Sequence, residues 1–235
     1  FLGNSLSSAG DFNNDGYLDF IIGAYQNSDA GAYAGKAFLY TNTTNLTQIS
    51  MINFPGYQPN IGMGWSVSDA GDLNGDGFDD IVAGMSNVVS GQPAKVFFGG
   101  RFMDNISDVS LYGSPYVSYR VASAGDVNND GYDDIITADL FNITNGTDAG
   151  AAFIFLGGQN MSGVPDITLY GTSAGDNFGY AISSAGDVNN DGYGDVIVGA
   201  PLNDGNEMID AGAAYIFYGG LNMNNTPDVV MYGEF

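Results

Sequence analysis

Aspartate and asparagine recur in a short glycine-containing loop that has the spacing of a calcium site. In the stretch Asp187–Asp195, side-chain oxygens occupy positions one, three, five and nine, and glycine occupies position six. Calcium takes about six to eight oxygen ligands, so a short loop must turn sharply to supply them. Alternate side chains point inward, the backbone carbonyl of position seven can add another oxygen, and Gly192 permits the turn. The stretch therefore predicts an oxygen-ligated divalent cation.

The same nine-residue pattern occurs four times, each time after an Ala-Gly pair and before an apolar run. The predicted ligands, with position seven contributing its carbonyl, are Asp11, Asn13, Asp15, Tyr17 and Asp19; Asp72, Asn74, Asp76, Phe78 and Asp80; Asp126, Asn128, Asp130, Tyr132 and Asp134; and Asp187, Asn189, Asp191, Tyr193 and Asp195. One copy could be an ordinary polar turn, since Asp, Asn and Gly favour turns. Four copies with the same ligand positions favour about four bound Ca²⁺ ions. An EF-hand is excluded, because it requires Glu at position twelve, where all four copies carry an uncharged residue.

The composition indicates an all-β protein. The 235 residues include 36 Gly, 15 Tyr and 15 Phe but only four cations, which suits strands and turns rather than helices. No window shows sustained helical periodicity, so we expect almost no helix. A single all-β domain over residues 1–235 is compatible with this length.

The net charge of −23 argues against partners that are themselves anionic, namely nucleic acids and acidic membrane surfaces. Twelve of the 27 acidic residues occupy positions one, five and nine of the four loops. Without metal these clustered carboxylates should repel one another, so we expect folding and calcium binding to be linked.

Other features favour an extracellular or cell-surface location. They are the sequons and the loop charge described next; the lack of Cys only excludes a disulfide framework, and no apolar run approaches the about 20 residues of a membrane span. Seven N-x-Ser/Thr sequons, which would make the chain a glycoprotein if used, begin at Asn42, Asn45, Asn105, Asn142, Asn145, Asn160 and Asn224. Millimolar extracellular calcium also suits loops of this charge.

The loops recur at a period that predicts a β-propeller. Their first aspartates fall at positions 11, 72, 126 and 187, which divides the chain into blades of approximately 1–61, 62–115, 116–176 and 177–235. Joining the two chain ends would restore the repeat spacing. We therefore expect a closed ring of four four-stranded blades, with part of a seven-bladed propeller as the alternative.

Four strands are expected in each blade. A short strand rich in small residues precedes each loop and should be innermost. A β-branched strand follows the loop and should be buried on both faces. An aromatic third strand should pack blade against blade, and an alternating fourth strand should form the outer edge. In the last repeat these strands are Tyr180–Ser184, Val196–Ala200, Ala213–Tyr218 and Val229–Tyr232.

Phe178-Gly179, the loop Asp187–Asp195 and Gly199-Ala200-Pro201 together resemble the FG-GAP repeat of integrin α-subunit propellers. The resemblance covers essentially the whole chain and is strongest in the fourth repeat. It implies that each loop joins the first and second strands of a blade and binds Ca²⁺ on one face of the propeller. Integrin propellers have seven blades, whereas this chain has repeats for four.

No constellation for catalysis is apparent, so we expect a protein that is not an enzyme. The absence of His excludes Ser-His-Asp and His-metal sites. The pairs Asp79–Asp80 and Asp133–Asp134 could do acid–base work, but we expect the second member to bind calcium and the first to be solvated. A polysaccharide-active enzyme would need two facing carboxylates outside the loops, and the candidates for these are Asp139, Asp176, Asp204 and Glu207.

The leading hypothesis is a calcium-stabilised extracellular propeller that acts in adhesion, protein binding or self-assembly. Its partner would be a protein, a glycan or copies of itself, with no nucleic acid and no membrane span. A polysaccharide-binding or polysaccharide-active module is one alternative, and a fragment of an integrin-like propeller is another.

Overall fold

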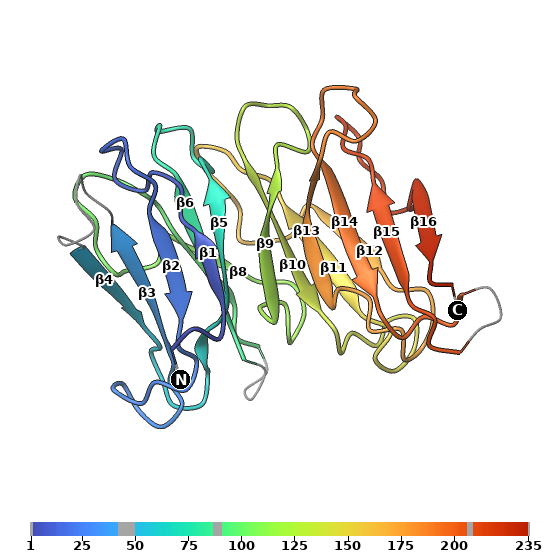
Figure 1. The fold of residues 1–235 in the computed structure, drawn as a ribbon, viewed down its shortest axis with the longest axis horizontal. Helices are drawn as coiled ribbons and strands as arrows, with labels where there is room; N and C mark the ends of the chain where they lie inside the picture. Colours follow the sequence, from blue (N-terminus) through green and yellow to red (C-terminus); the bar gives the residue numbers. More distant parts are fainter. Residues whose placement is uncertain (1, 42–49, 87–90, 206–208, 235) are drawn as a thin grey trace.

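Sixteen β-strands form four sheets in the computed structural model, which describes residues 2–41, 50–86, 91–205 and 209–234 (Figure 1). The first blade contains β1 (Leu6–Ser8), β2 (Phe20–Gly23), β3 (Lys36–Thr41) and β4 (Ser50–Pro55), and the second contains β5 (Met63–Gly71), β6 (Asp80–Met85), β7 (Ala94–Phe97) and β8 (Val109–Leu111). The third contains β9 (Arg120–Gly125), β10 (Asp134–Asp139), β11 (Ala151–Phe155) and β12 (Ile167–Tyr170), and the fourth contains β13 (Ala181–Gly186), β14 (Asp195–Ala200), β15 (Ala213–Phe217) and β16 (Val229–Tyr232). Within these described segments, no helix is long and apolar enough to cross a bilayer.

Each sheet is an antiparallel meander whose strands pair in chain order. The first strands of successive blades, β1, β5, β9 and β13, lie next to one another in that order. The predicted all-β propeller architecture is thereby confirmed. Figure 1 shows the four sheets side by side, with the first and fourth blades at opposite ends of the row. Closure into a four-bladed ring is therefore not shown, and the arrangement fits the alternative, in which the four blades are part of a larger propeller.

Small residues allow the blades to approach closely near the inner strands. A Cβ atom added to Gly23 in the first blade would lie 1.9 Å from the carbonyl oxygen of Gly64 in the second. A Cβ at Gly84 in the second blade would lie 2.3 Å from the carbonyl oxygen of Ser118. Because both distances are far below van der Waals contact, only glycine fits at these two points.

The apolar core is divided into three layers, one between each pair of neighbouring blades. Aromatic contacts cross these mainly aliphatic layers: Phe54 of β4 in the first blade packs on Phe97 of β7 in the second, with ring centroids 4.2 Å apart. In the fourth blade, Tyr215 and Phe217 of β15 belong to the layer shared with the third blade. The prediction that aromatic third strands pack blade against blade is thus confirmed for the second to fourth blades, and it is wrong for the first, where Phe38 and Tyr40 of β3 lie outside these layers.

The two end blades differ from the middle ones because each has one face without a neighbouring blade. Strands β6 and β10 are buried along their whole length, whereas β2 and β14 carry partly exposed residues between buried ones. On the outward face of the first blade, Phe20 and Tyr40 stack on each other at 5.0 Å. The prediction that every second strand is buried on both faces is therefore right for the middle blades and wrong for the ends.

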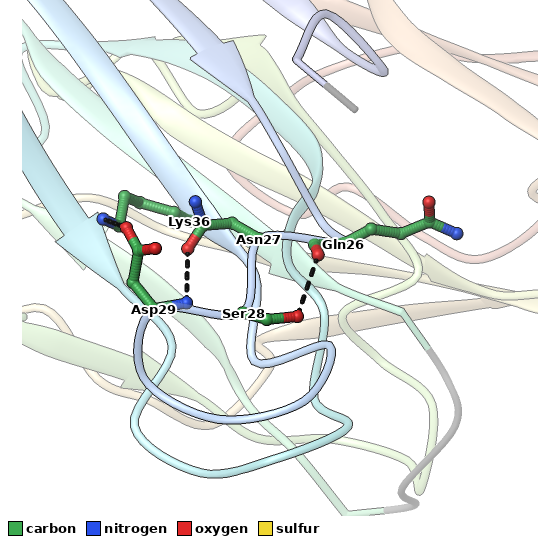
Figure 2. Close-up of polar contacts among 5 residues, drawn as sticks. All are labelled: Gln26, Asn27, Ser28, Asp29 and Lys36. Carbon is green, nitrogen blue, oxygen red and sulfur yellow. Dashed lines mark hydrogen bonds and ion pairs between the residues drawn. The ribbon is translucent and has the colours of Figure 1, made fainter.

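The turn between β2 and β3 is held by local polar contacts, as Figure 2 shows. The Asn27 Oδ1 atom accepts the Asp29 N–H at 3.0 Å, and the Ser28 hydroxyl donates to the Gln26 carbonyl at 3.3 Å. The Lys36 ammonium lies 2.6 Å from an Asp29 oxygen and lowers the pKa of that carboxyl. Among the residues that the structure describes this is the one ion pair, and its role is structural.

Candidate functional site

The four Asp-rich loops connect the first and second strands of their blades and lie along the upper edge of the molecule in Figure 1. Two positions of each loop have left-handed backbone. The glycine at position six has φ between 86° and 95° in all four loops. Position four is also left-handed, and it is occupied by Asn14, Gly75, Asn129 or Asn190. Asn and Gly tolerate this conformation best, so the residue type at position four was a signal that the sequence analysis missed.

The aspartate at position one anchors each loop. In the second loop, the Asp72 Oδ1 atom accepts the Asp76 N–H at 3.1 Å, and its Oδ2 atom accepts the Gly77 N–H at 2.9 Å. The first, third and fourth loops repeat both hydrogen bonds at 2.8–3.1 Å. The backbone is thereby wound around the first predicted ligand.

Positions three and five complete the inner side of the turn. In the second loop, the Asn74 Oδ1 atom accepts the Asp76 N–H at 2.9 Å, and the Asn74 Nδ2 atom donates to Asp76 Oδ2 at 3.0 Å. The third and fourth loops have the same pair of contacts. In all four loops the position-five carboxylate also accepts the N–H of position seven. The predicted side-chain ligands at positions one, three and five therefore face one turn of backbone.

The aspartate at position nine lies beneath the loop rather than on its surface. Asp80, Asp134 and Asp195 are fully buried, and Asp19 is 2% exposed. The Asp80 Oδ2 atom accepts the N–H of Leu73 at position two, and its Oδ1 atom accepts the Gly99 N–H, both at 2.8 Å. Asp134 and Asp195 make equivalent contacts. In the second to fourth blades this carboxylate thus joins its loop to the turn after the third strand, a structural role that the sequence analysis did not predict.

Burial has a marked effect on the position-nine carboxylates of the middle blades in the metal-free protein. It raises the pKa of Asp80 to about 8 and that of Asp134 to about 7, against an ordinary value of 3.8, and nearby carboxylates add to the rise. The folded state therefore binds protons that the unfolded state does not bind between pH 8 and pH 4. Stability must then increase as the pH falls through this window.

We accordingly expect the Tm of the protein in EDTA to rise by several degrees on acidification from pH 8 to pH 5. Thermal melts followed by circular dichroism at unit pH intervals would measure this. Relief of general charge repulsion acts in the same direction, so Asp80→Asn is the control, and its pH dependence should be weaker. A metal-free Tm that stays constant or falls on acidification would contradict the expectation.

The donor set of the loops fits a hard cation. Every predicted side-chain ligand is an oxygen of Asp or Asn, and a carboxylate that accepts two N–H groups still has lone pairs available. In the first loop, Asn13 Oδ1 at position three is buried and has no hydrogen-bond partner. Within the described ranges, however, no three acidic side chains come together closely enough to form a metal-holding group. The donor atoms and their spacing in the sequence suit calcium, the carboxylates are not gathered in threes, and metal binding belongs to the proposals below.

The surroundings of Asp79 and Asp133, at position eight of their loops, differ from those expected. Both carboxylates are partly buried rather than solvated. Asp79 Oδ2 accepts the Asp11 N–H at 2.6 Å, and Asp133 Oδ2 accepts the Asp72 N–H at 3.0 Å. The prediction of a solvated carboxylate was wrong because sequence spacing within one loop gives no sign of a contact with the preceding blade.

Three of the four carboxylates considered for an enzymatic alternative accept hydrogen bonds within turns. Asp176 is 2% exposed and accepts hydrogen bonds from Thr172 Oγ1 and Asn203 Nδ2 at 3.1 and 2.8 Å. Asp139 is 1% exposed and accepts the Phe141 N–H at 2.9 Å. Asp204 accepts the N–H of Asp210 in a local turn, and Glu207 lies outside the described residues. Asp139 and Asp176 are thus buried carboxylates rather than members of an exposed pair.

Four meander blades with an Asp-rich loop between first and second strands define a β-propeller of the FG-GAP type. Sequence comparison agrees: residues 11–83 match the FG-GAP-like repeat, and residues 118–155 and 178–217 match the FG-GAP repeat. The chain belongs to the FG-GAP repeat, integrin α-like family.

Curated relatives are integrin α chains. The protein is 38% identical to integrin alpha pat-2 of Caenorhabditis elegans over 67% of its own length, and 32% identical to integrin alpha-5 of Xenopus laevis over 100%. It is 31% identical to integrin alpha-V of Gallus gallus over 85% of its length. The matches span only 14%, 17% and 20% of these three relatives.

Proposed function

We propose that the chain is a calcium-stabilised propeller segment that binds protein at the cell surface and has no enzymatic activity. The metal proposal places about four Ca²⁺ ions in the loops, one per blade. Side-chain oxygens at positions one, three, five and nine and the carbonyl of position seven would hold each ion. Its support is the common winding of all four loops around their position-one aspartate, together with the FG-GAP family membership.

The observation that carries protein binding is a chain of aromatic side chains across all four blades. We call it the aromatic surface, and its members are Tyr25, Trp65, Tyr116, Tyr119, Phe141 and Tyr180, with Arg120 between two of the rings. These residues lie at one end of the first and second strands of their blades, and the Asp-rich loops lie at the other end. Those strand ends form the lower edge of the molecule in Figure 1.

Neighbouring members of the aromatic surface are in contact. The Trp65 ring lies 4.8 Å from Tyr25 and 5.5 Å from Tyr119. The Arg120 guanidinium lies 4.8 Å from the Tyr119 ring and 5.5 Å from the Tyr180 ring, which is half exposed. Trp, Tyr and Arg are the residues that contribute most to protein–protein binding energy. A contiguous set of them on a strongly acidic protein supports a protein-binding face.

Adhesion of cells to surfaces coated with the chain, in millimolar calcium, tests this proposal. Trp65→Ala and Tyr119→Ala should each reduce adhesion at least several-fold, since such residues typically cost 2 kcal/mol or more at interfaces. Phe102→Ala is the matched control, because Phe102 is 99% exposed and is not part of the aromatic surface. Equal adhesion by the control and the two aromatic variants would count against protein binding at this face.

The outward faces of the end blades support placement within a larger propeller. Three aromatic residues face outward on the first blade, namely Phe20, Phe38 and Tyr40. In the second to fourth blades, the residues at the same positions are covered by the blade before them. Ile197 and Ile216 on the fourth blade correspond to Ile136 and Ile154, which are fully buried in the third. Further blades of the same type would cover both faces. Self-assembly into a homopolymer, a glycan partner and use of the sequons stay predictions from sequence.

A further inference from the structure

Two carboxylates at position eight reach out of their own blade into the preceding one. Asp79 lies in the loop of the second blade, and its Oδ2 atom is 2.6 Å from the N atom of Asp11, the first residue of the first loop. Asp133 of the third blade has the same relation to Asp72 of the second, at 3.0 Å. The Asp133 N–H also donates to the Asp72 carbonyl at 3.2 Å, so the two loops share a pair of hydrogen bonds.

A glycine in the preceding blade leaves room for each of these two carboxylates. The residue before the accepted N–H is Gly10 in the first blade and Gly71 in the second, with φ of 60° and 66°. A Cβ atom at either glycine would lie 2.1 Å from the Oδ2 atom of Asp79 or Asp133. Any side chain there would displace the carboxylate, so the Ala-Gly pair before these two loops has a specific steric function.

The contact is not present in this form at every blade junction. Position eight of the fourth blade is Gly194, which uses its backbone N–H to bond the Asp126 carbonyl at 2.8 Å and brings no carboxylate. Position eight of the first blade is Leu18, which is 70% exposed. The molecule therefore contains two junctions with the carboxylate and one without, which provides an internal comparison.

We propose that Asp79 and Asp133 are positioning residues for the metal loop of the preceding blade: Asp79 for the first loop and Asp133 for the second. Each holds the backbone of the residue whose side chain is the position-one ligand, and each places a negative charge beside that loop. A charge-assisted hydrogen bond of this kind is stronger than a neutral one. The inference rests on the proposed calcium binding, because it concerns how tightly a loop holds its ion.

Because the Asp79 and Asp133 contacts run from one loop to the loop of the preceding blade, the effect of one loop on another should have a direction. Asp79 is followed at once by Asp80, the position-nine residue of the second loop, so ordering of the second loop fixes the group that supports the first. Likewise, ordering of the third loop supports the second through Asp133. At the third junction the loops are joined by backbone bonds alone, from Gly194 to the Asp126 carbonyl and from Gly220 to the Val127 carbonyl. Loss of a position-eight carboxylate should thus weaken binding in the preceding blade rather than in its own.

Terbium(III) luminescence can separate the loops, because an aromatic residue at position seven acts as the sensitiser. Tyrosine occupies this position in the first, third and fourth loops, and Phe78 in the second. In a Tyr132→Phe, Tyr193→Phe background, Tyr17 reports on the first loop. Additional Tyr17→Phe and Phe78→Tyr substitutions transfer the report to the second loop. Asp11→Ala is added to this second background to remove the first site, because a position-seven ring also lies beside the preceding loop, as the Tyr132 ring does beside Gly75. Titration with terbium, and competition with calcium, then give an affinity for one loop at a time.

We expect Asp79→Asn to weaken terbium binding in the first loop about tenfold and to leave the second within about twofold, as the loss of one charge-assisted contact implies. Asp133→Asn should weaken the second loop by a similar factor. The matched control is Asp104→Asn, which removes an exposed charge from the same blade as Asp79 and should change neither loop.

Three results would overturn the proposal: an effect of Asp79→Asn confined to the second loop, an equal effect on both loops, or no effect on either. Failure of the unsubstituted protein to bind terbium or calcium would instead overturn the proposed calcium binding. Amide hydrogen exchange in saturating calcium gives a measurement that does not depend on affinity. The Asp11 amide should exchange faster in Asp79→Ala, and unchanged protection there would also contradict the proposal.

Discussion

Removal of calcium with EDTA is expected to lower the Tm of the protein by tens of degrees. A site whose free ligand is at 100 times its dissociation constant stabilises the folded state by about 2.7 kcal/mol. Four such sites would together contribute an amount comparable with the whole stability of an ordinary domain, about 5–15 kcal/mol. Loss of the ions would also leave the twelve carboxylates of the four loops without a counter-charge in a chain of net charge −23.

Differential scanning calorimetry in millimolar calcium, in EDTA and after calcium is restored would measure this effect. Asp187→Ala removes the position-one ligand of a single loop, and at that ligand excess it should lower the Tm in calcium by about 5–11 °C. Asp104→Asn, which alters an exposed carboxylate outside the loops, should melt within about 2 °C of the unsubstituted protein. If EDTA leaves the Tm unchanged, the loops are polar turns without a metal, and the calcium proposal fails.

The repeated pattern made the fold predictable. Four loops at near-equal spacing, each between a small-residue strand and a β-branched strand, specify four similar antiparallel sheets. The observed bounds of β14 and β16 agree with the expected ones to within one residue. Strand β5 is longer than the short strand Trp65–Ser68 that small residues indicate before the second loop, because pairing continues past two irregularities to Gly71 opposite Asp80. Local pattern gives no information about such a bulge.

Contacts between blades could not be predicted, because they depend on the relative position of residues about 60 apart. The turn that follows the third strand is one case. Gly99 donates its N–H to Asp80 of its own blade, and Gly100 donates to the Phe12 carbonyl in the first loop at 2.8 Å. Gly157-Gly158 and Gly219-Gly220 repeat this arrangement at the next two junctions. In sequence these pairs read as ordinary turns.

These contacts explain why metal binding and blade packing should form one cooperative system. In the second to fourth blades the position-nine carboxylate holds the Gly-Gly turn of its own blade, and that turn bonds to the loop of the preceding blade. An ion that orders one loop thereby also orders the surface on which the next blade packs. The loops are accordingly part of the interfaces between blades and are not isolated additions to a finished fold.

Phe178→Ala is expected to destabilise the protein by about 3–5 kcal/mol even when calcium is saturating, which corresponds to a fall in Tm of about 6–20 °C. Phe178 is 1% exposed and belongs to the apolar layer between the third and fourth blades. Its ring meets Tyr215 and Phe217 edge-on, at centroid distances of 5.3 and 6.2 Å. Truncation would leave a cavity that the surrounding strands, fixed by their ladders, cannot close.

Urea denaturation in saturating calcium, followed by circular dichroism, would measure this loss as a lower midpoint. Phe102→Ala is the control, because it removes the same atoms from a ring that is 99% exposed, and it should change the stability by less than about 0.5 kcal/mol. A midpoint for Phe178→Ala equal to that of the control would mean that the fourth blade does not depend on this contact. If instead the slope of the transition falls, the fourth blade separates from the other three before they unfold.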